Sequence, residues 1–306
     1  MTARRVSIVI VNWNSGDQLA RCLHSIALFG GEHVDKVVVV DNHSTDQSLT
    51  SVMAHSSVTA IKLEENAGFA RACNIGARNL SADFILFLNP DAALLDGAIG
   101  AVLDFLDTPK NSDVGICGVQ LIDEQESVWR SCARFPTPMR LVSLATGADR
   151  IFPIIGTTMG EWDHRQSRRV DQVIGAFFLV RSDLFRSLGG FDERFFVYFE
   201  EVDFAFRASR RGMGTMFLAD IKAFHAGGGT SGQVKARRLF YSLRSRILYA
   251  RKHFSRMGYF LVIVTAFGLE PVARSVNHLV RGQLVGVRET LVAYRMLFDW
   301  VRGVEK

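Results

Sequence analysis

The chain has 306 residues and a net formal charge of +5, and 48% of its residues are hydrophobic, which suits one large domain or two small ones. Its four cysteines form no CxxC pair and no regular framework, which argues against a disulfide scaffold and fits buried thiols in a reducing cytosol. The N-terminus leads directly into a strand-like segment, so we expect no secretory signal.

The first part of the chain alternates short apolar runs with amphipathic segments. Buried strands are predicted over residues 6–11, 37–40, 59–63 and 84–88. Helices are predicted over residues 15–28 and 68–80. This alternation implies right-handed βαβ units and a mostly parallel sheet. Ligands of such sheets bind beyond the carboxyl ends of the strands, which is where Asn12, Asp41 and Asp91 stand.

The pattern changes near residue 113. Further strands are predicted over residues 114–122, 173–180 and 216–225. Short helices are predicted over 182–188 and 200–211, each followed by glycine. The proline-containing stretch between the first two of these strands is predicted to be irregular. A loop of that length is usually functional or mobile.

The last part of the chain is basic and has a helical pattern. Residues 231–306 contain 14 Lys or Arg and 4 Asp or Glu, whereas the rest of the chain contains 22 and 27. Such a distribution suggests that the tail meets an anionic surface. Two series of arginines recur every seven residues, which would place each series on one face of a helix. The series are Arg237, Arg244 and Arg251, and Arg274, Arg281, Arg288, Arg295 and Arg302.

An uncharged block over residues 258–269 separates the two arginine series. The block is twelve residues long, whereas a membrane span needs about 20. We therefore expect an interfacial or buried helix, and basic stripes with apolar intervals suit a helix at a membrane surface. One alternative is a helical subdomain whose arginines are merely solvated. The other is a nucleic-acid-binding tail, which the scarcity of aromatics placed for base stacking disfavours.

The strand predicted over 84–88 ends abruptly in Asn89, Pro90 and Asp91. Mg²⁺ and Mn²⁺ prefer oxygen ligands and are usually held by one or two carboxylates plus substrate phosphates. An acid at a strand tip, after a proline, supplies such a ligand, so Asp91 is a candidate metal ligand. Alternatively, Asn89 and Pro90 form a turn, and Asp91 caps a short helix over residues 92–95.

An aromatic run ends in three acids, Glu200, Glu201 and Asp203. Carboxylates this close repel one another, which raises at least one pKa. A carboxylate with a raised pKa suits a general base that works near neutral pH. The alternative is a first helical turn that favours acids, with Asp203 paired to Arg207 one turn later.

Polar residues near other predicted element ends are weaker candidates. Asp41 could accept a hydrogen bond from a nucleobase N–H or form an Asx turn. Asn66 precedes the helix that begins at Gly68, and this helix offers Arg71 to a phosphate, unless the arginine is simply solvated. His225 ends the last strand, and a neutral imidazole can ligate a metal, although a lone histidine is usually structural.

Two common nucleotide-binding motifs do not occur in the sequence. No GxGxxG follows the first strand, and no GxxxxGK[ST] occurs. A dinucleotide site or a P-loop site of the usual kind is therefore not expected.

Taken in order, these stretches resemble family 2 glycosyltransferases of the GT-A fold, in particular the bacterial rhamnosyltransferase-like branch. The resemblance covers about residues 5–255. It implies an α/β, Rossmann-like and mostly parallel sheet with helices on both faces, plus a C-terminal helical extension. The matching stretches are residues 8–14, 39–46, 65–69, 86–91, 175–181, 189–196 and 198–203.

The resemblance also implies a division of the chain. A catalytic GT-A domain would cover residues 1–232, and a basic amphipathic helical region would cover residues 233–306. Within the catalytic domain, the nucleotide-binding half would cover about residues 1–112. The acceptor half would cover about residues 113–232.

On the donor side, the resemblance assigns Asp41 to the nucleobase and Asp91 to a Mn²⁺ or Mg²⁺ ion on the sugar-nucleotide diphosphate. Asn89 stands where many members carry Asp. In some relatives a histidine beyond the base completes the metal site, and this position corresponds to His225. The donor-binding residues are then Asn12, Asp41, Asn66, Arg71, Asn89 and Asp91.

The catalytic base of the family corresponds best to Glu201, with Glu200 and Asp203 as the next candidates. Glu201 stands where Asp is commoner, so its carboxylate reaches one methylene further. It would remove a proton from the acceptor hydroxyl, which attacks the anomeric carbon from the face opposite the leaving nucleotide.

The implied function is an inverting, metal-dependent glycosyltransferase of bacterial cell-surface polysaccharide assembly. Its donor would be dTDP-L-rhamnose and its acceptor a polyprenyl-diphosphate-linked saccharide. We expect a cytoplasmic protein, peripheral on the anionic inner face of the plasma membrane, without a nucleic-acid partner. The alternatives are a transferase with a UDP- or GDP-linked sugar and a nucleotide-sugar-binding protein without turnover. The sequence leaves the oligomeric state open.

Overall fold

The computed structural model describes residues 4–227 and 235–303, and the chain divides into two compact units. Unit 1 contains residues 4–133, 163–196 and 200–227. Unit 2 contains residues 134–162, 197–199 and 235–303. Unit 2 thus combines two segments from the middle of the chain with the C-terminal region. The functional division near residue 232 stays a prediction.

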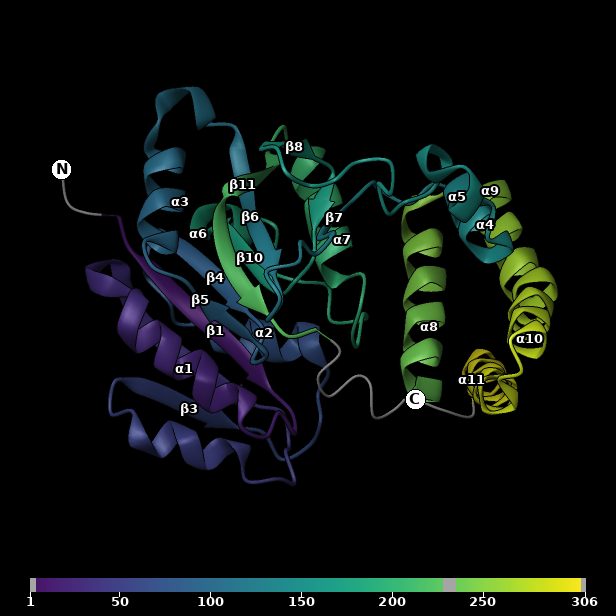
Figure 1. Ribbon diagram of the computed structural model, residues 1–306, viewed down its shortest axis with the longest axis horizontal. Helices are drawn as coiled ribbons and strands as arrows, with labels where there is room; N and C mark the ends of the chain where they lie inside the picture. The colour runs from purple at the N-terminus through teal and green to yellow at the C-terminus, as the bar shows by residue number, and fades with distance from the viewer. Residues whose placement is uncertain (1–3, 228–234, 304–306) are drawn as a thin grey trace. The chain divides into compact units, whose positions relative to one another are not determined.

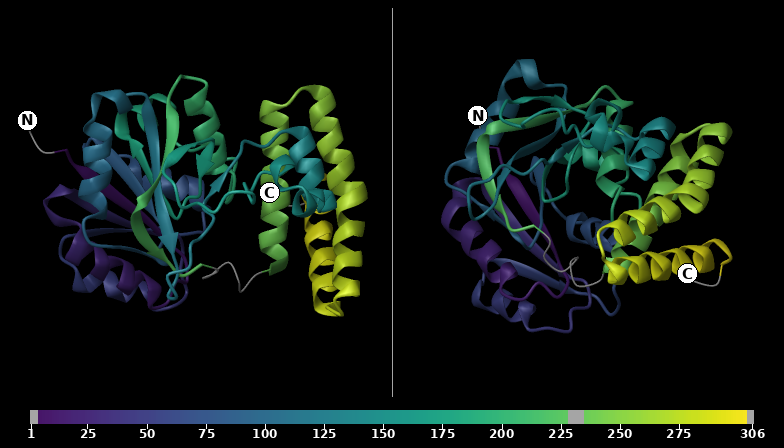
Figure 2. Two further views of the ribbon diagram at one scale, coloured as in Figure 1. Left: turned by 45° about the horizontal axis from the view of Figure 1, so that its top comes forward. Right: turned by 45° about the vertical axis from the view of Figure 1, so that its right-hand side comes forward.

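Unit 1 is built on one curled sheet of mixed direction (Figures 1 and 2). Its parallel part consists of β3 (Val58–Lys62), β2 (Val34–Asp41), β1 (Val6–Asn12) and β4 (Phe84–Leu88). The order continues through β10 (Phe177–Arg181), β6 (Val114–Ile122), β11 (Gly214–His225) and β5 (Ala92–Leu94). Strand β10 runs antiparallel to its neighbours β4 and β6. Strands β5 and β8 (Arg168–Val170) both run antiparallel to β11, whereas β6 and β11 run parallel to each other. A separate pair joins β7 (Cys132–Ala133) to β9 (Gln172–Val173).

Helices cover both faces of the main sheet. On one face, α1 (Gln18–Phe29) and α3 (Ala98–Asp107) share a buried apolar core with β1 and β4. The other face carries α2 (Phe69–Ala77), α6 (Ser182–Ser187) and α7 (Glu200–Ser209). Gly76 of α2 lies so close to Val9 that a Cβ would come within 2.6 Å of it. Because helices pack on both faces of this α/β sheet, the predicted fold class is confirmed.

Within its described residues, unit 1 also contains three 3₁₀ segments. They are η1 (Gly31–His33), η2 (Ser48–Ala54) and η3 (Pro109–Asn111).

In unit 1 one open alternative and one predicted strand are wrong, and a second predicted strand has different bounds. No helix follows Asp91, because the next residues form β5 and pair with β11. The strand predicted over 173–180 is two strands, β9 and β10, which belong to different sheets. The last strand is longer than predicted, because Gly214 already pairs with β6.

The proline-containing stretch predicted to be irregular is so over most of its length, but its middle part is helical, which the sequence did not predict. It contains α4 (Pro138–Thr146), α5 (Ala148–Ile151) and η4 (Pro153–Ile155). Thr137 caps α4 by accepting a hydrogen bond from the Arg140 amide, and Pro138 occupies the first turn, where it costs no hydrogen bond. Gly147, with φ of +75°, ends the helix.

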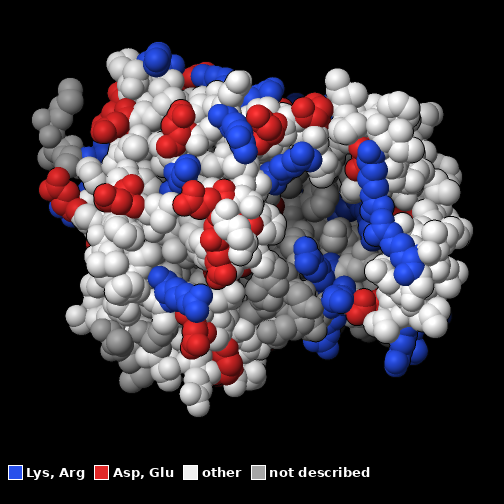
Figure 3. All heavy atoms as spheres, in the orientation of Figure 1, with Lys and Arg blue, Asp and Glu red and all other residues white. Residues whose placement is uncertain are grey.

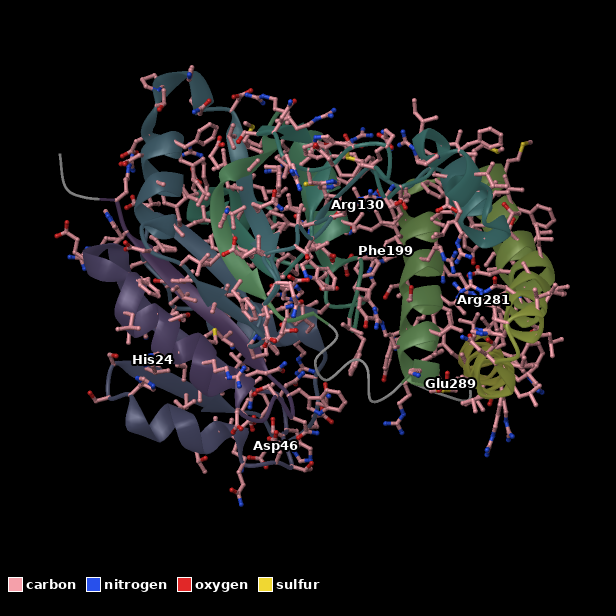
Figure 4. All side chains as sticks on the ribbon, viewed as in Figure 1. His24, Asp46, Arg130, Phe199, Arg281 and Glu289 are labelled. Carbon is pink, nitrogen blue, oxygen red and sulfur yellow. The ribbon has the colours of Figure 1, made fainter. Side chains whose placement is uncertain are left out.

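Unit 2 places α4 beside the C-terminal helices. These are α8 (Lys235–His253), α9 (Arg256–Val264), the π-helical turn η6 (Thr265–Leu269), α10 (Glu270–Val280) and α11 (Leu284–Val301). The core holds Phe240, Leu243, Ile247, Ala266, Ala293 and Leu297. Phe199, labelled in Figure 4, packs on Tyr249 of α8 with 5.5 Å between ring centroids.

The uncharged block at 258–269 belongs to a longer helical run than its own length indicates. The run extends without a break over Arg256–Val280, 25 residues with a mean hydropathy of 1.4 in its most apolar window. By length and composition it could cross a membrane, a criterion that core helices of soluble proteins also meet. Only 22% of that window is buried within the structure.

Of the two predicted arginine series, the first lies on one helix, because Arg237, Arg244 and Arg251 all belong to α8. The second series is interrupted because α10 ends at Val280 and Gly282 adopts φ of +68° before α11 begins. Arg274 pairs with the buried Glu270 at 2.7 Å, and Arg244 lies 5.5 Å from the ring centroid of Trp300. Arg274 and Arg244 therefore interact with other residues of unit 2. The remaining arginines of the two series form the basic surface.

Candidate active site

The carboxyl ends of β1 and β2 bring Asn12 and Asp41 together. The two residues are register partners, and both are almost fully buried. The Asn12 side-chain amide donates to Asp41 Oδ1 at 2.8 Å and to Ser48 Oγ at 2.9 Å. It also lies 3.1 Å from Ser44 Oγ. A buried carboxylate held by an amide in this way is a fixed acceptor at the edge of the sheet where ligands of such folds bind.

The loop after β2 is held in place by its own polar side chains. Asp46, labelled in Figure 4, accepts hydrogen bonds from the amides of Gly16 at 2.8 Å and Ser48 at 3.1 Å. Burial opposes ionisation, yet the hydrogen bonds from Ser48 and Gly16 outweigh it and lower the pKa of Asp46. His43 and Asn14 adopt φ of +65° and +49°, values that such polar residues tolerate better than bulky ones.

Asn66 joins this region to the start of α2. Its Oδ1 accepts from Asn42 Nδ2 at 2.9 Å and from the Gly68 amide at 3.0 Å. Gly68 adopts φ of +84°, and a Cβ there would lie 2.5 Å from the Phe196 carbonyl oxygen, so only glycine fits. Through these two hydrogen bonds Asn66 stabilises the loop before α2.

Arg71 projects from the first turns of α2 and is half exposed. Its Nε lies 3.9 Å from Glu193 Oε2, and about half of each side chain is accessible. An exposed pair at this distance contributes little to stability. The guanidinium therefore exchanges partners at little cost, which suits a residue that receives a phosphate.

A second polar cluster forms where β5 pairs with β11. In this antiparallel pair His225 lies opposite Ala92, and the Ala226 amide donates to the Asp91 carbonyl at 3.0 Å. His225 Nε2 consequently faces Asp91 Oδ1 at 3.4 Å, with 9% and 12% of the two side chains exposed. The Nδ1 atom of His225 has no hydrogen-bond partner among the described residues.

Trp129 packs against the imidazole of this pair, a contact that no sequence pattern predicts. Its ring meets the His225 ring edge-on, with 5.6 Å between centroids, and 37% of the residue is exposed. Gly227 allows the approach, because a Cβ there would lie 2.4 Å from the indole. An isolated tryptophan after a strand carries no signal of such a contact, which depends on the sheet order.

Asp91 and His225 have the chemistry of a pair that could share one divalent ion. An imidazole nitrogen and a carboxylate oxygen are both ligands of Mn²⁺, and the two atoms point toward each other. No group of three or more His, Cys, Asp or Glu in the described ranges 4–227 and 235–303 is placed to hold a metal. Asn89 lies two residues before Asp91 and is half-buried, with its backbone amide bonded to the Ala176 carbonyl at 3.1 Å.

The three acids at the start of α7 follow a strained turn. Tyr198 and Phe199 adopt φ of +67° and +71°, a conformation that costs bulky residues of the order of 1–3 kcal/mol each. Glu200 and Glu201 then open the helix. Strain of this kind is often found where a side chain must be aimed at a reacting group.

The three acids have different surroundings. Glu200 is 4% exposed, and its Oε2 has no hydrogen-bond partner in the described part of the chain. Burial, followed by the charge of Glu201, raises the pKa of Glu200 well above 4.5. Asp203 is fully buried and accepts from Arg207 Nε at 2.7 Å, the pairing expected of a structural acid. Glu201 is only half-buried.

Arg207 ties this helix to the preceding loop. Besides Asp203, it donates to the carbonyl oxygens of Leu188 and Gly190, each at 2.8 Å. The same loop is fastened to α2, where Asn74 accepts from the Phe191 amide at 2.9 Å and donates to its carbonyl at 2.8 Å. Helices α2 and α7 are thereby held in one rigid frame.

The curled α/β sheet, with acidic side chains at its strand ends, defines a GT-A-type fold of a sugar-transferring enzyme. A family model for glycosyl transferase family 2 matches residues 7–187. The chain belongs to this family and is a glycosyltransferase. The predicted resemblance is thus confirmed, while the roles of individual residues stay predictions.

Two curated relatives are similar over most of the chain. One is an N-acetylglucosaminyl-diphospho-decaprenol L-rhamnosyltransferase from Mycobacterium tuberculosis, 26% identical over 79% of this chain and 82% of its own length. Another is the rhamnosyltransferase WbbL from Escherichia coli, 26% identical over 72% of this chain and 82% of its own length.

A solved structure shares the fold. A mannosyltransferase from Pyrobaculum calidifontis, in complex with GDP-Man and Mn²⁺, superposes with a TM-score of 0.56 and 17% sequence identity. The match covers 98% of this chain and 81% of the mannosyltransferase.

Proposed function

We propose that this chain is an inverting, metal-dependent rhamnosyltransferase that moves L-rhamnose from dTDP-L-rhamnose to a polyprenyl-diphosphate-linked saccharide during assembly of a bacterial cell-surface polysaccharide. The names of the two rhamnosyltransferase relatives support the sugar, and the name of the mycobacterial relative supports the lipid-linked acceptor. The observation that carries the proposal is the facing pair of Asp91 and His225 at the edge of the sheet.

Donor recognition falls to the residues at the ends of β1 and β2. The Asp41 carboxylate, held by Asn12, is the acceptor proposed for the nucleobase N–H. Asn66 shapes the loop before α2, and Arg71 leaves its exposed partner Glu193 to meet the diphosphate. The donor site is therefore largely preformed, apart from the mobile arginine side chain.

Asp91 and His225 are the residues proposed to hold Mn²⁺ or Mg²⁺, as the Mn²⁺ of the mannosyltransferase complex suggests for the fold. When bound, the ion would neutralise the charge that develops on the departing nucleotide diphosphate. Two protein ligands leave room for phosphate oxygens and water, which is usual for Mg²⁺ bound with nucleotides. Asn89 would orient a phosphate or sugar hydroxyl nearby.

Glu201 is the proposed catalytic base. A general base must be ionised before the reaction, and burial and the charge of Glu201 raise the pKa of Glu200, which makes Glu200 harder to ionise. Asp203 is occupied by Arg207. Glu201 remains as the half-buried carboxylate of the three, and a protonated Glu200 beside it would spare it a second negative charge.

A lipid-linked acceptor would be reached at the cytoplasmic face of the plasma membrane, which is the location we propose for the enzyme. Unit 2 supplies the basic surface, with exposed Arg237, Arg251, Arg281, Arg288 and Arg295. The protein should sediment with anionic liposomes at low salt and be released, at least partly, at high salt. Charge-reversal variants test this better than truncation near residue 255, because α8 packs on α9 and α11 and would lose its buried face.

A transfer assay tests the proposal as a whole. Purified protein with Mn²⁺ and a synthetic polyprenyl-diphosphate saccharide should transfer sugar from dTDP-L-rhamnose and invert the anomeric configuration. Faster transfer from a UDP- or GDP-linked sugar would overturn the donor assignment. Donor binding by thermal shift without transfer or hydrolysis would favour a non-catalytic nucleotide-sugar-binding protein.

A further inference from the structure

The exposed large hydrophobic side chains of the described residues are concentrated in unit 2. All but two of them, Leu28 and Trp129, lie there. Exposed apolar clusters of this kind usually mark an interaction surface. Figure 3 shows stretches of unit 2 with few charged side chains on the face that it draws.

One part of this surface comes from the middle of the chain. Residues 151–155, which we call the apolar knuckle, join α5 to η4. Ile151 is 74% exposed, Phe152 60%, Ile154 68% and Ile155 43%. These residues lie about 80 positions before the basic tail, so no pattern within the tail predicts them.

The backbone of the knuckle bonds within its own segment. The Phe152 amide donates to the Ala148 carbonyl at 2.9 Å, and the Ile155 amide donates to the Phe152 carbonyl at 3.1 Å. Pro153 has no amide proton, and its carbonyl accepts from Gly156 at 3.1 Å. The Ser143 hydroxyl donates to the Ile155 carbonyl at 3.2 Å. Because these polar groups are paired, the turn could enter a water-poor interface at little cost.

The knuckle is mounted firmly on the helices of unit 2. Its support, α4, packs on α9, and Leu141 of α4 shares a small apolar cluster with Val262 of α9 and Ala250 of α8. Gly258 of α9 lies against Pro138, where a Cβ would come within 2.8 Å. The four apolar side chains are therefore presented by a packed helical frame.

Helices α9 and α10 of the same unit carry further exposed apolar side chains. These include Met257, Phe260, Val264, Val272, Val276 and Leu279. Two exposed arginines flank these apolar side chains. Arg150 directly precedes the knuckle, and Arg256 is the first residue of α9. The described residues of unit 2 contain 16 Lys or Arg and 5 Asp or Glu, so the charge around the apolar surface complements an anionic one. Apolar side chains flanked by arginine suit the boundary between headgroups and acyl chains.

We propose that the apolar knuckle inserts into the headgroup–acyl boundary of an anionic lipid bilayer and is a membrane-binding element separate from the C-terminal tail. The inference deepens the membrane location given under the proposed function and rests on it. Lipid is the proposed partner of the knuckle, because the basic residues of unit 2 would repel a second copy of the same unit.

The test places an environment-sensitive fluorophore on the knuckle. Ile154→Cys is labelled in the full-length protein, since Cys22, Cys73, Cys117 and Cys132 are all buried. Leu28→Cys, 59% exposed in unit 1, is the matched control. With vesicles of phosphatidylglycerol and phosphatidylcholine, the label at 154 should shift to the blue and be quenched by brominated acyl chains. The label at 28 should not respond.

A second pair of variants measures binding. Phe152→Asp combined with Ile154→Asp should weaken vesicle binding at least about tenfold, since each side chain loses its apolar burial. Leu28→Asp should leave binding unchanged. Both sites are exposed, so equal melting temperatures establish that the variants fold.

The outcomes separate the two proposals. If the protein sediments with vesicles while the label at 154 stays in water, the knuckle is not a membrane element and the peripheral location stands. If the protein does not sediment at all, both fail. If the label becomes shielded without lipid as protein concentration rises, together with a dimer mass, the occupant is a second copy and the lipid proposal is overturned.

Discussion

His225 Nε2 and Asp91 Oδ1 face each other across 3.4 Å, although the two residues are far apart in the chain. The antiparallel pairing of β5 with β11 creates this relationship, because it sets His225 opposite Ala92. Trp129 closes one side of the pair by meeting the imidazole edge-on. The proposed metal chemistry depends on these three residues lying together.

Asp91→Ala should abolish transfer and weaken metal-dependent donor binding. The expected loss in rate is about 10²-fold or more, because ion-based stabilisation is worth several kcal/mol and each 1.36 kcal/mol is tenfold. Transfer rates and donor titrations with and without Mn²⁺ measure both effects. Asp96→Ala, which changes an exposed acid nearby, is the control. Wild-type turnover with wild-type Mn²⁺ dependence would refute the assignment.

His225→Ala should raise the metal concentration needed for half-maximal rate, more for Mn²⁺ than for Mg²⁺, because imidazole is the softer ligand. Direct Mn²⁺ binding, followed by electron paramagnetic resonance, gives a readout that does not depend on turnover. The exposed His24, labelled in Figure 4, provides the control His24→Ala. An unchanged metal titration would return His225 to a purely structural role.

Glu201→Gln should keep donor affinity and lose turnover by about 10²–10⁴-fold, the usual contribution of a general base. The same measurement on Glu200→Gln should show a much smaller loss, because the raised pKa of Glu200 makes it harder to ionise and only an ionised carboxylate can accept the acceptor's proton. If the two variants exchange these phenotypes, Glu200 is the base.

The raised pKa of Glu200 makes a prediction for stability. Above about pH 4.5 the unfolded chain loses the proton of Glu200 while the folded chain still holds it, so the group's contribution falls as pH rises toward the folded pKa. Glu200→Gln removes this loss. The melting temperature of the variant should therefore exceed that of the wild type at neutral pH, with the difference vanishing near pH 4. A difference that is independent of pH would show that Glu200 does not titrate as described.

Arg207→Ala should destabilise the protein by about 3–5 kcal/mol, because it leaves the fully buried Asp203 without its partner. Denaturant unfolding measures the loss. Arg210→Ala, at an exposed arginine just after α7, should change stability by less than about 0.5 kcal/mol. A loss below about 1 kcal/mol for Arg207→Ala would mean that the pair is not needed to hold α7.

The sequence by itself was sufficient to predict the strands of the parallel half of the sheet. The apolar runs that become β1, β2, β3 and β4 are short, β-branched or aromatic, and bounded by polar turns. Asn12 and Asp41 were placed correctly at strand ends, because parallel neighbours end at the same edge. These features are local, so periodicity and residue type reveal them.

Only the tertiary structure decided the rest. The pairing of Asp91 with His225 depends on strand order, and the different surroundings of Glu200 and Asp203 depend on what packs over α7. Residues 134–162 join the C-terminal helices through apolar contacts between distant segments, which no local pattern encodes. Burial and long-range contact determine which acid is ionised, which is paired and which apolar side chains stay exposed, and these are properties of the folded chain.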